Sequence, residues 1–266
     1  MGTKSTSNHL NEEKDWDGHS TNSSKKTKSS LPGKKWSSYI KEFLMLFLAI
    51  FCGFLAENYR ENMVEKQQEK QFIQSYIEDL KSDTTTIRIA LDFRKLKMIQ
   101  MDSLMLMLST QTIKGHENEL YYFGRTLVRS VWFQSNDRTI TQLKNSGSLR
   151  LIRNEQATDS IMSYQKLVER LITNHEDDRT ERYNAFPIIS QIFDPFVFDK
   201  MVTVNGIQRP TDNPPLRSYD PSLQQDLAFC IHQLKGSTFL IEGRLELLNE
   251  KAIRLIDLLN TEYNLE

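Results

Sequence analysis

Residues that interrupt helices are scarce in this chain, which has 10 glycines and 7 prolines among 266 residues. From Lys34 to Lys114 there is no proline, and Gly53 is the one glycine. Proline lacks a backbone N–H group and glycine is costly to order, so both disfavour a helix interior. The stretch therefore predicts one long helix, although Ser82 and Asp83 leave open a second helix start within it.

Cysteine is scarcer still, because Cys52 and Cys230 are the only two. Cys52 lies within an apolar run and Cys230 within a predicted helix, so we expect no disulfide within the chain. Stability of the chain beyond that run must then come from packing, for which about 200 residues suffice. Cys230 is interpreted as a buried thiol, with an interchain disulfide as the alternative.

Catalytic motifs are missing as well. There is no Gly-x-Ser-x-Gly, no glycine-rich phosphate loop, no Cys-x-x-Cys and no Glu-x-x-His pair of the kind that metal-binding bundles use. We therefore expect that the chain is not an enzyme and has no catalytic, cofactor-binding or metal-ligating residue and no cofactor. The formal net charge of −1 gives no support for nucleic-acid binding.

One cluster of ionisable residues surrounds a histidine, at residues 175–178, where His175 precedes three acidic residues. We interpret it as a solvated charged turn rather than as a metal site. A second hypothesis follows from helical spacing, since Asp178 and Arg94 both occupy steps of apolar helix faces. The two side chains are then predicted to pair inside a helical bundle.

The longest apolar run extends over fourteen residues, from Phe43 to Ala56. At ~1.5 Å per residue it reaches about 21 Å, which is short of the ~30 Å hydrocarbon core of a bilayer. Aromatic rings extend it at both ends, from Trp36 to Tyr59, as in the interfacial belts of a spanning helix. We therefore predict a transmembrane helix over residues 36–59, with the lipid bilayer as a partner.

Three other interpretations of the run compete. A cleaved signal peptide is disfavoured because the run begins only at residue 43, and a lipoprotein is disfavoured because the bulky Phe51 precedes Cys52. A buried helix of a soluble domain remains open, because apolar runs of 10–14 residues are often of that kind.

Basic residues are distributed unevenly about this segment. Six lysines lie shortly before the run, whereas the basic residues after it are mixed with glutamates; the six are Lys25, Lys26, Lys28, Lys34, Lys35 and Lys41. The more basic flank stays in the cytoplasm, so residues 60–266 are predicted to lie outside it. Residues 1–35 have almost no aliphatic side chains and are predicted to be a disordered cytoplasmic tail.

A helical seam follows the predicted membrane segment, with side chains spaced alternately four and three apart, close to a heptad. Arg94 fills one step of this seam; the other members are Ile73, Ile77, Leu80, Thr84, Ile87, Leu91, Met98, Met101, Met105 and Leu108.

Further helices are predicted over residues 119–146, closing on Gly147 and with an alternative break near Asn136, and over residues 154–193. Residues 194–220 hold four prolines and are predicted to be a loop with a short hairpin. Pro221 opens a last helix, which Gly236 is predicted to kink or divide. The predicted fold is all-α, with a single transmembrane helix that continues into a long helix, followed by an antiparallel helical bundle.

Small residues four apart occur twice within the membrane segment, at Ala49 and Gly53 and at Cys52 and Ala56. Such pairs let two helices approach closely, although a lone pair is a weak signal. A homo-oligomer is therefore kept as an open alternative.

Two segments are distinctive in combination. The first, within residues 41–84, is KEFLMLFLAIFCGFLAENYREN followed by EKQFIQSYIEDLKSDT, and the second, residues 138–164, is RTITQLKNSGSLRLIRNEQATDSIMSY. Together they resemble a family of bacterial single-pass membrane proteins of unknown activity that is common in Bacteroidetes. The resemblance covers about a quarter of the chain. It implies a single-pass topology in a Gram-negative inner membrane, and it implies no catalytic residue.

These observations favour a membrane-anchored helical bundle that acts in protein interaction or scaffolding at the cell envelope, with an unknown protein partner. A ligand-sensing bundle is the alternative, and an envelope enzyme is the weakest interpretation. A pocket between the helices would favour sensing, whereas a large exposed apolar patch would favour assembly.

Overall fold

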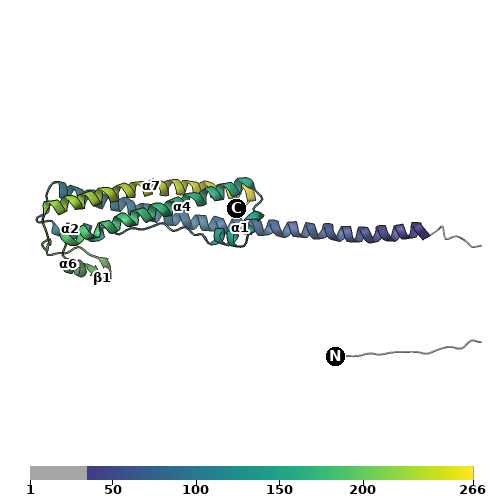
Figure 1. The fold of residues 1–266 in the computed structure, drawn as a ribbon, viewed down its shortest axis with the longest axis horizontal. Helices are drawn as coiled ribbons and strands as arrows, with labels where there is room; N and C mark the ends of the chain where they lie inside the picture. Colours follow the sequence, from purple (N-terminus) through teal and green to yellow (C-terminus); the bar gives the residue numbers. More distant parts are fainter. Residues whose placement is uncertain (1–34, 266) are drawn as a thin grey trace, which may run out of the picture. The chain divides into compact units, whose positions relative to one another are not determined.

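The computed structural model describes residues 35–265, and the chain divides into two units, residues 1–57 and 58–266. The tail predicted for residues 1–35 lies outside the described residues except for Lys35. The fold is all-α, as predicted, because a long first helix is followed by other helices that pack against it (Figure 1).

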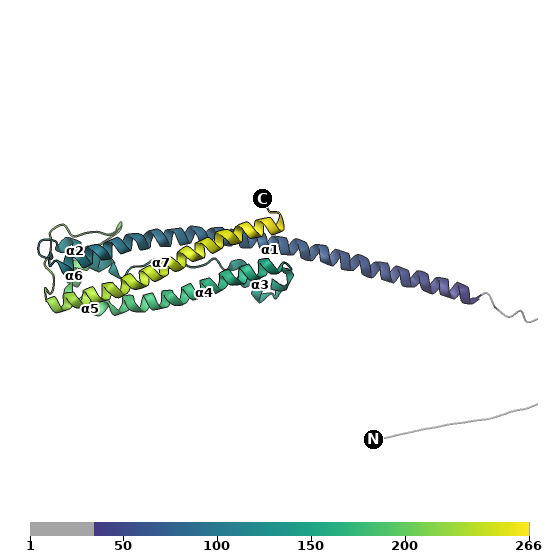
Figure 2. The same ribbon diagram turned by 90° about the horizontal axis from the view of Figure 1, so that it is seen from above.

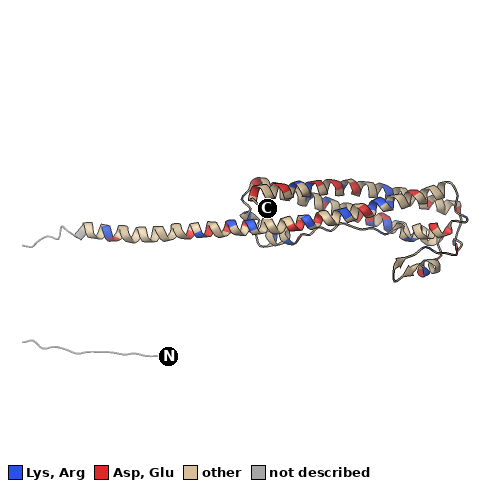
Figure 3. Cartoon of the chain, turned by 180° about the vertical axis from the view of Figure 1, so that it is seen from behind, with Lys and Arg blue, Asp and Glu red and all other residues tan. Residues whose placement is uncertain are grey.

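Helix α1 is a single helix from Lys35 to Ser109, with no second start at Ser82. The side chains of residues 36–57, which belong to the first unit, are all exposed. Figure 3 shows that most of this stretch has no charged residue. Among the described residues, α1 is the one helix long and apolar enough to cross a membrane, with a mean hydropathy of 1.9 over its most apolar window.

The second unit holds the rest of α1 and six shorter helices. These are α2 (Glu117–Leu127), α3 (Arg138–Asn145), α4 (Glu155–Asn184), α5 (Phe186–Ile192), α6 (Pro195–Lys200) and α7 (Pro221–Tyr263). A 3-10 helix, η1 (Ser148–Leu151), follows α3, and a small antiparallel hairpin joins β1 (Val202–Thr203) to β2 (Gly206–Ile207).

Helices α4 and α7 lie side by side and antiparallel (Figure 1, Figure 2). Near the start of α4, Asn154 donates to Glu262 of α7 at 2.7 Å, and near its end Glu181 accepts a hydrogen bond from Ser237. The predicted antiparallel bundle is therefore formed by α4, α7 and the second half of α1.

Several helix ends follow the local chemistry that the sequence predicts. Asn154 and Asp220 cap α4 and α7, each accepting a backbone N–H from the first turn with its side chain. Pro221 occupies the first turn of α7, where its missing N–H has no cost. Gly147 has the left-handed backbone expected shortly after a helix end, with φ of 67°.

Other predicted boundaries were wrong. A continuous helix over residues 119–146 was wrong, whereas the alternative break near Asn136 is confirmed, because residues 128–137 are not helical and separate α2 from α3. The helix predicted over residues 154–193 breaks at Ala185, two residues before Pro187, which has no N–H to continue the ladder. The predicted loop 194–220 contains α6, which Asp194 caps, in addition to the expected hairpin. Gly236 neither ends nor divides α7.

The core face of α1 agrees with the predicted seam at seven of its eleven positions, Ile77 among them, and differs from it at the other four. Its main row of buried side chains is spaced three and four apart, with Glu69, Ile77 and Asp79 buried beside it: Ile73, Tyr76, Leu80, Asp83, Ile87, Ala90, Arg94, Lys97, Met101, Leu104 and Leu108. At these four positions the predicted seam has Thr84, Leu91, Met98 and Met105, which are only half-buried, whereas the side chain one residue before each of them is buried. Burial in this bundle therefore includes polar positions that an apolar pattern passes over.

Asp83 of α1 binds the non-helical segment that follows α2. Its carboxylate accepts hydrogen bonds from the backbone N–H of Asn136 at 2.6 Å, from Ser135 Oγ at 2.8 Å and from the Tyr164 hydroxyl of α4 at 2.6 Å. Burial raises the pKa of Asp83 above its ordinary value, although these hydrogen bonds oppose the shift. One carboxylate thus joins α1, the connecting segment and α4.

Two further carboxylates of α1 act in the same way. Asp79 accepts from the backbone N–H of Thr139 at 2.9 Å and from Arg138 at 3.1 Å, which holds the start of α3. Glu69 accepts from the backbone N–H of Arg153 at 2.8 Å and from the Tyr263 hydroxyl of α7 at 2.6 Å. The return connection from α2 to α4 is therefore bound to α1 at three places.

Removing the carboxylate at residue 83 is predicted to destabilise the bundle. The Asp83→Ala variant leaves the Asn136 N–H and two hydroxyls without their acceptor in a buried place, so we expect a loss of about 3 kcal/mol in the free energy of unfolding. The matched Asp92→Ala variant changes an exposed carboxylate of the same helix and is expected to lose less than about 0.5 kcal/mol. Chemical denaturation of the full chain in detergent, followed by circular dichroism, measures both; equal losses would contradict the prediction.

Candidate functional site

A layer of polar side chains divides the apolar core of the second unit. One apolar cluster extends to Ala90, Leu171 and Ile241, and the other begins at Met101 and Leu234. Buried polar side chains lie between them on three helices: Arg94 and Lys97 of α1, His175, Asp178 and Arg182 of α4, and Thr238 of α7. We refer to these six residues as the polar layer.

Asp178 is the anionic centre of the polar layer. It accepts two hydrogen bonds from Arg182, from Nε and Nη2, at 2.9 Å each, and a third from Trp132 Nε1 at 3.2 Å. Arg182 also donates through Nη1 to the carbonyl oxygen of Leu127 at 3.1 Å. This two-pronged arginine–carboxylate pair binds α4 to the end of α2, and its charges are compensated inside the core.

Arg94 lies close to the same carboxylate but is not hydrogen-bonded to it. Its Nη2 is 3.9 Å from Asp178 Oδ2, and the two side chains are 1% and 0% exposed. The predicted pairing of Arg94 with Asp178 inside the bundle is therefore confirmed as a buried contact, at a distance too long for a hydrogen bond. The three side-chain nitrogens of Arg94 have no hydrogen-bond partner among residues 35–265. Burial lowers the pKa of Arg94 to about 10, and Asp178 opposes this shift.

Lys97 adds another cation to the polar layer. Its Nζ donates to the carbonyl oxygen of Thr126 at 2.6 Å and to Gln100 at 3.1 Å. Burial, reinforced by the positive charges of Arg182 and Arg129, lowers the pKa of Lys97 to about 8. The sequence pattern missed this residue because the apolar Met98 lies beside it.

His175 and Thr238 complete the polar layer without hydrogen-bond partners among the described residues. Burial, together with the charge of Arg94, lowers the pKa of His175 to about 4, so the imidazole is neutral at pH 7. The interpretation of residues 175–178 as a solvated turn was wrong for His175 and Asp178, which are buried within α4. Within the described part of the chain, no group of three or more His, Cys, Asp or Glu side chains is placed to hold a metal ion.

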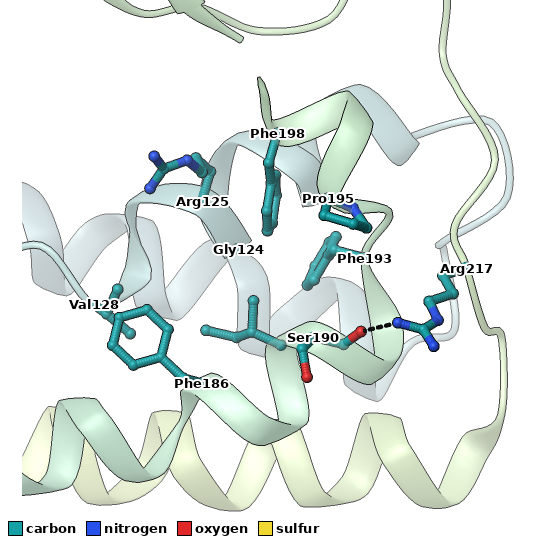
Figure 4. Close-up of a pocket in the computed structure, with 10 residues that line it drawn as sticks. Gly124, Arg125, Val128, Phe186, Ser190, Phe193, Pro195, Phe198 and Arg217 are labelled. Carbon is teal, nitrogen blue, oxygen red and sulfur yellow. Dashed lines mark hydrogen bonds between the residues drawn. The ribbon is translucent and has the colours of Figure 1, made fainter. Parts of the chain in front are cut away.

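A second candidate site is a pocket of about 200 Å³ in the second unit, formed by α2, α5, α6 and the loop before α7 (Figure 4). Its apolar lining consists of Val128, Phe186, Ile189, Phe193, Pro195 and Phe198, with Gly124 beside them. Its polar lining consists of Arg125, Ser190 and Arg217. We refer to it as the aromatic pocket.

Packed rings form one wall of the aromatic pocket. Phe193 stacks on Phe198 with ring centroids 5.3 Å apart, and both rings meet Tyr121 edge to face. Gly124 of α2 makes this possible, since a Cβ at that position would lie 2.6 Å from the Phe193 ring. The Tyr121 hydroxyl accepts the backbone N–H of Asp194 and donates to the carbonyl oxygen of Pro215 at 2.8 Å, so the ring wall is tied to the loop.

Two arginines stand at opposite sides of these rings in Figure 4. Arg217 donates through Nη1 to the carbonyl oxygen of Ser190 at 2.9 Å. Arg125 lies over the Phe198 ring, with its guanidinium carbon 5.8 Å from the ring centroid. Within residues 35–265 no carboxylate forms an ion pair with it. The aromatic pocket therefore combines an apolar interior with positive charge at its edge.

A third feature is an exposed apolar stripe on α1, beyond the predicted membrane segment. It consists of Ile89, Leu96, Ile99 and Leu106, which are between 53% and 63% exposed. Their spacings of seven, three and seven keep them on one helix face. At 100° per residue this face lies about 170° around the helix from the core face. We refer to these four residues as the α1 stripe.

Comparisons of the chain with models of protein families, with curated proteins and with solved structures found no match. The resemblance to a Bacteroidetes membrane-protein family therefore stays a prediction.

The three features differ in what they can do. The polar layer is buried on all sides, so its effect is on stability and packing rather than on a ligand from solution. The aromatic pocket and the α1 stripe are open, and each presents apolar surface to an outside partner. The signal for the stripe is present in the sequence, as apolar residues opposite the seam. The pocket depends on segments more than sixty residues apart and has no such signal.

The two arginines beside Asp178 are predicted to differ in their contribution to stability. Arg94→Met removes a buried guanidinium that has no hydrogen bond, so we expect the free energy of unfolding to stay the same or to rise by about 1–2 kcal/mol. Arg182→Met removes both hydrogen bonds from the carboxylate, so we expect a loss of about 3–5 kcal/mol. Chemical denaturation of both variants measures the difference. A loss in Arg94→Met as large as that in Arg182→Met would refute this assignment.

Proposed function

We propose that the chain is a single-pass membrane protein whose helical bundle binds other proteins at the cell envelope, as a scaffold or as part of a complex. The α1 stripe carries this proposal, because soluble monomeric surfaces seldom keep such a row of apolar side chains in water. No enzymatic activity and no cofactor form part of it.

The proposed location is a bacterial inner membrane, with residues 36–59 spanning the bilayer, the N-terminus in the cytoplasm and residues 60–266 in the periplasm. The six lysines before the apolar run support this orientation, and the exposed apolar side chains of residues 43–56 support burial in lipid. The lipid bilayer is thus one partner of the chain.

The other partner is either a different protein or a second copy of this chain, and membrane anchoring limits how a second copy can approach. Copies anchored in one membrane with the same orientation hold their α1 helices parallel. Spacings of seven, three and seven suit the contact face of two parallel helices. Full burial of an exposed Leu or Ile side chain contributes about 1.5–3 kcal/mol, and these four, at 53–63% exposed, would each contribute roughly half of that in a contact.

A ligand-sensing bundle is the second candidate function, and the aromatic pocket is the observation that favours it. The pocket joins α2, α5 and α6 to the loop before α7, so a bound molecule would affect how these segments pack.

Reporter fusions are predicted to show the proposed orientation. A reporter that is active only in the periplasm, joined after Glu266, is expected to be active, because the basic flank keeps the N-terminus inside. The same reporter joined before the apolar run, after Gly33, serves as the matched control and is expected to be inactive. Activity of a cytoplasm-specific reporter after Glu266 would overturn the orientation.

Assembly is predicted to depend on the α1 stripe. The Ile99→Lys variant places a charge in the stripe and is expected to weaken partner binding at least tenfold, because the lysine must be desolvated in the contact. Ile172→Lys is the matched control, since Ile172 is also an exposed isoleucine, on α4, and it is expected to bind as the unchanged chain does.

Affinity purification of the full chain from gently solubilised membranes, with mass spectrometry and light scattering, measures partners and copy number in each variant. Neither variant is expected to change the melting temperature of the bundle, because both side chains are exposed. A monomer without partners, or an identical partner set in both variants, would count against assembly through the stripe.

A further inference from the structure

The interior of the aromatic pocket is preformed in the absence of a ligand. Phe193 is fixed by its stacking on Phe198 and by packing closely against Gly124, where there is no room for a Cβ atom. Tyr121 ties this wall to the loop through the backbone of Asp194. A ligand therefore meets an ordered apolar surface, and little ordering of side chains opposes its binding.

The size of the aromatic pocket limits what it can hold. About 200 Å³ is more than the ~150 Å³ of an apolar protein cavity that binds benzene, and it is less than the ~300 Å³ from which pockets for drug-sized molecules begin. One aromatic ring or a chain of about six carbons fits this space. A folded peptide segment or a large cofactor does not.

The charge at the edge of the aromatic pocket selects among small apolar ligands. Arg125 is half-buried, and Arg129, two residues beyond the end of α2, adds a second positive charge. Burial, together with this neighbour, lowers the pKa of Arg125 below its ordinary value. A bound anion would offset both effects, since it would pair the guanidinium and neutralise the local charge.

Arg217 supplies donors on the other side of the rings. Among residues 35–265, only the Nη1 of Arg217 has a hydrogen-bond partner, the carbonyl oxygen of Ser190, and a guanidinium has five N–H groups in all. Arg125 is the better candidate for the main contact, because it is the less exposed of the two and has no carboxylate partner within residues 35–265.

We propose that the aromatic pocket binds a small monocarboxylate with an apolar body, either one aromatic ring or a short alkyl chain. The body lies against Phe193 and Phe198, and the carboxylate pairs with the guanidinium of Arg125. The proposal deepens the second candidate function, ligand sensing, and does not depend on assembly through the α1 stripe.

Calorimetric titration of the full chain in lipid nanodiscs tests the site, with phenylacetate and hexanoate as probes. Phenylacetamide is the neutral counterpart of phenylacetate and is expected to bind at least tenfold more weakly. Arg125→Met keeps the apolar stem but removes the charge, so it is expected to weaken phenylacetate binding at least tenfold. Arg129→Met is the matched control, because Arg129 does not line the pocket, and it is expected to stay within threefold of the unchanged chain.

A second variant keeps the test decisive if the loss of charge disturbs folding. Val128→Phe fills the aromatic pocket from its lining and is expected to abolish binding of both probes, while the melting temperature without ligand stays within about 3 °C. The partners recovered by affinity purification are expected to be the same in this variant, which separates the site from assembly.

Three outcomes would overturn the proposal. In the first, neither probe binds at concentrations up to about 5 mM. In the second, phenylacetate and phenylacetamide bind equally well, so that the charge has no role. In the third, Arg129→Met weakens binding as much as Arg125→Met, so that the effect is one of general charge and not of a contact.

Discussion

Buried carboxylates on α1 are the constraint on which the rest of the second unit depends. Glu69, Asp79 and Asp83 accept backbone N–H groups from the connection between α2 and α4. Without them, these N–H groups would be left unpaired or the connection would have to leave the bundle. The connection, which includes α3 and η1, returns along α1, and this path lets α4 start where it can pair antiparallel with α7.

The same constraint explains how far the sequence could predict the fold. Helix α1, the start of α4 and the start of α7 were predictable, because each depends on local signals such as the lack of breakers, the cap at Asn154 and the Asp220-Pro221 pair. The break between α2 and α3 was predicted only as an alternative near Asn136, because the carboxylates that bind the backbone there lie more than fifty residues away on α1. Helical periodicity located Arg94 and Asp178 but passed over Asp83 and Lys97, because the hydrogen-bond partners of these two side chains lie on other segments of the chain.

The polar layer and the open surfaces have separate roles in this account. The polar layer divides the core and couples three helices, but its side chains are closed to solution. The α1 stripe lies on the opposite face of the same helix and offers a contact for a partner. The aromatic pocket is formed by segments that the chain brings together only on folding. For this reason the sequence did not predict the pocket, although its phenylalanines and arginines are all present there.

Backbone hydrogen exchange of the three bound amides tests the central claim most directly. The N–H groups of Asn136, Thr139 and Arg153 lie outside the helices or in a first turn, where exchange is ordinarily fast. If the carboxylates of α1 bind them, each amide is predicted to exchange at least about a hundredfold more slowly than an unstructured chain at the same pH. Exchange of all three at the unstructured rate would show that α1 does not hold the connection, and would contradict the account.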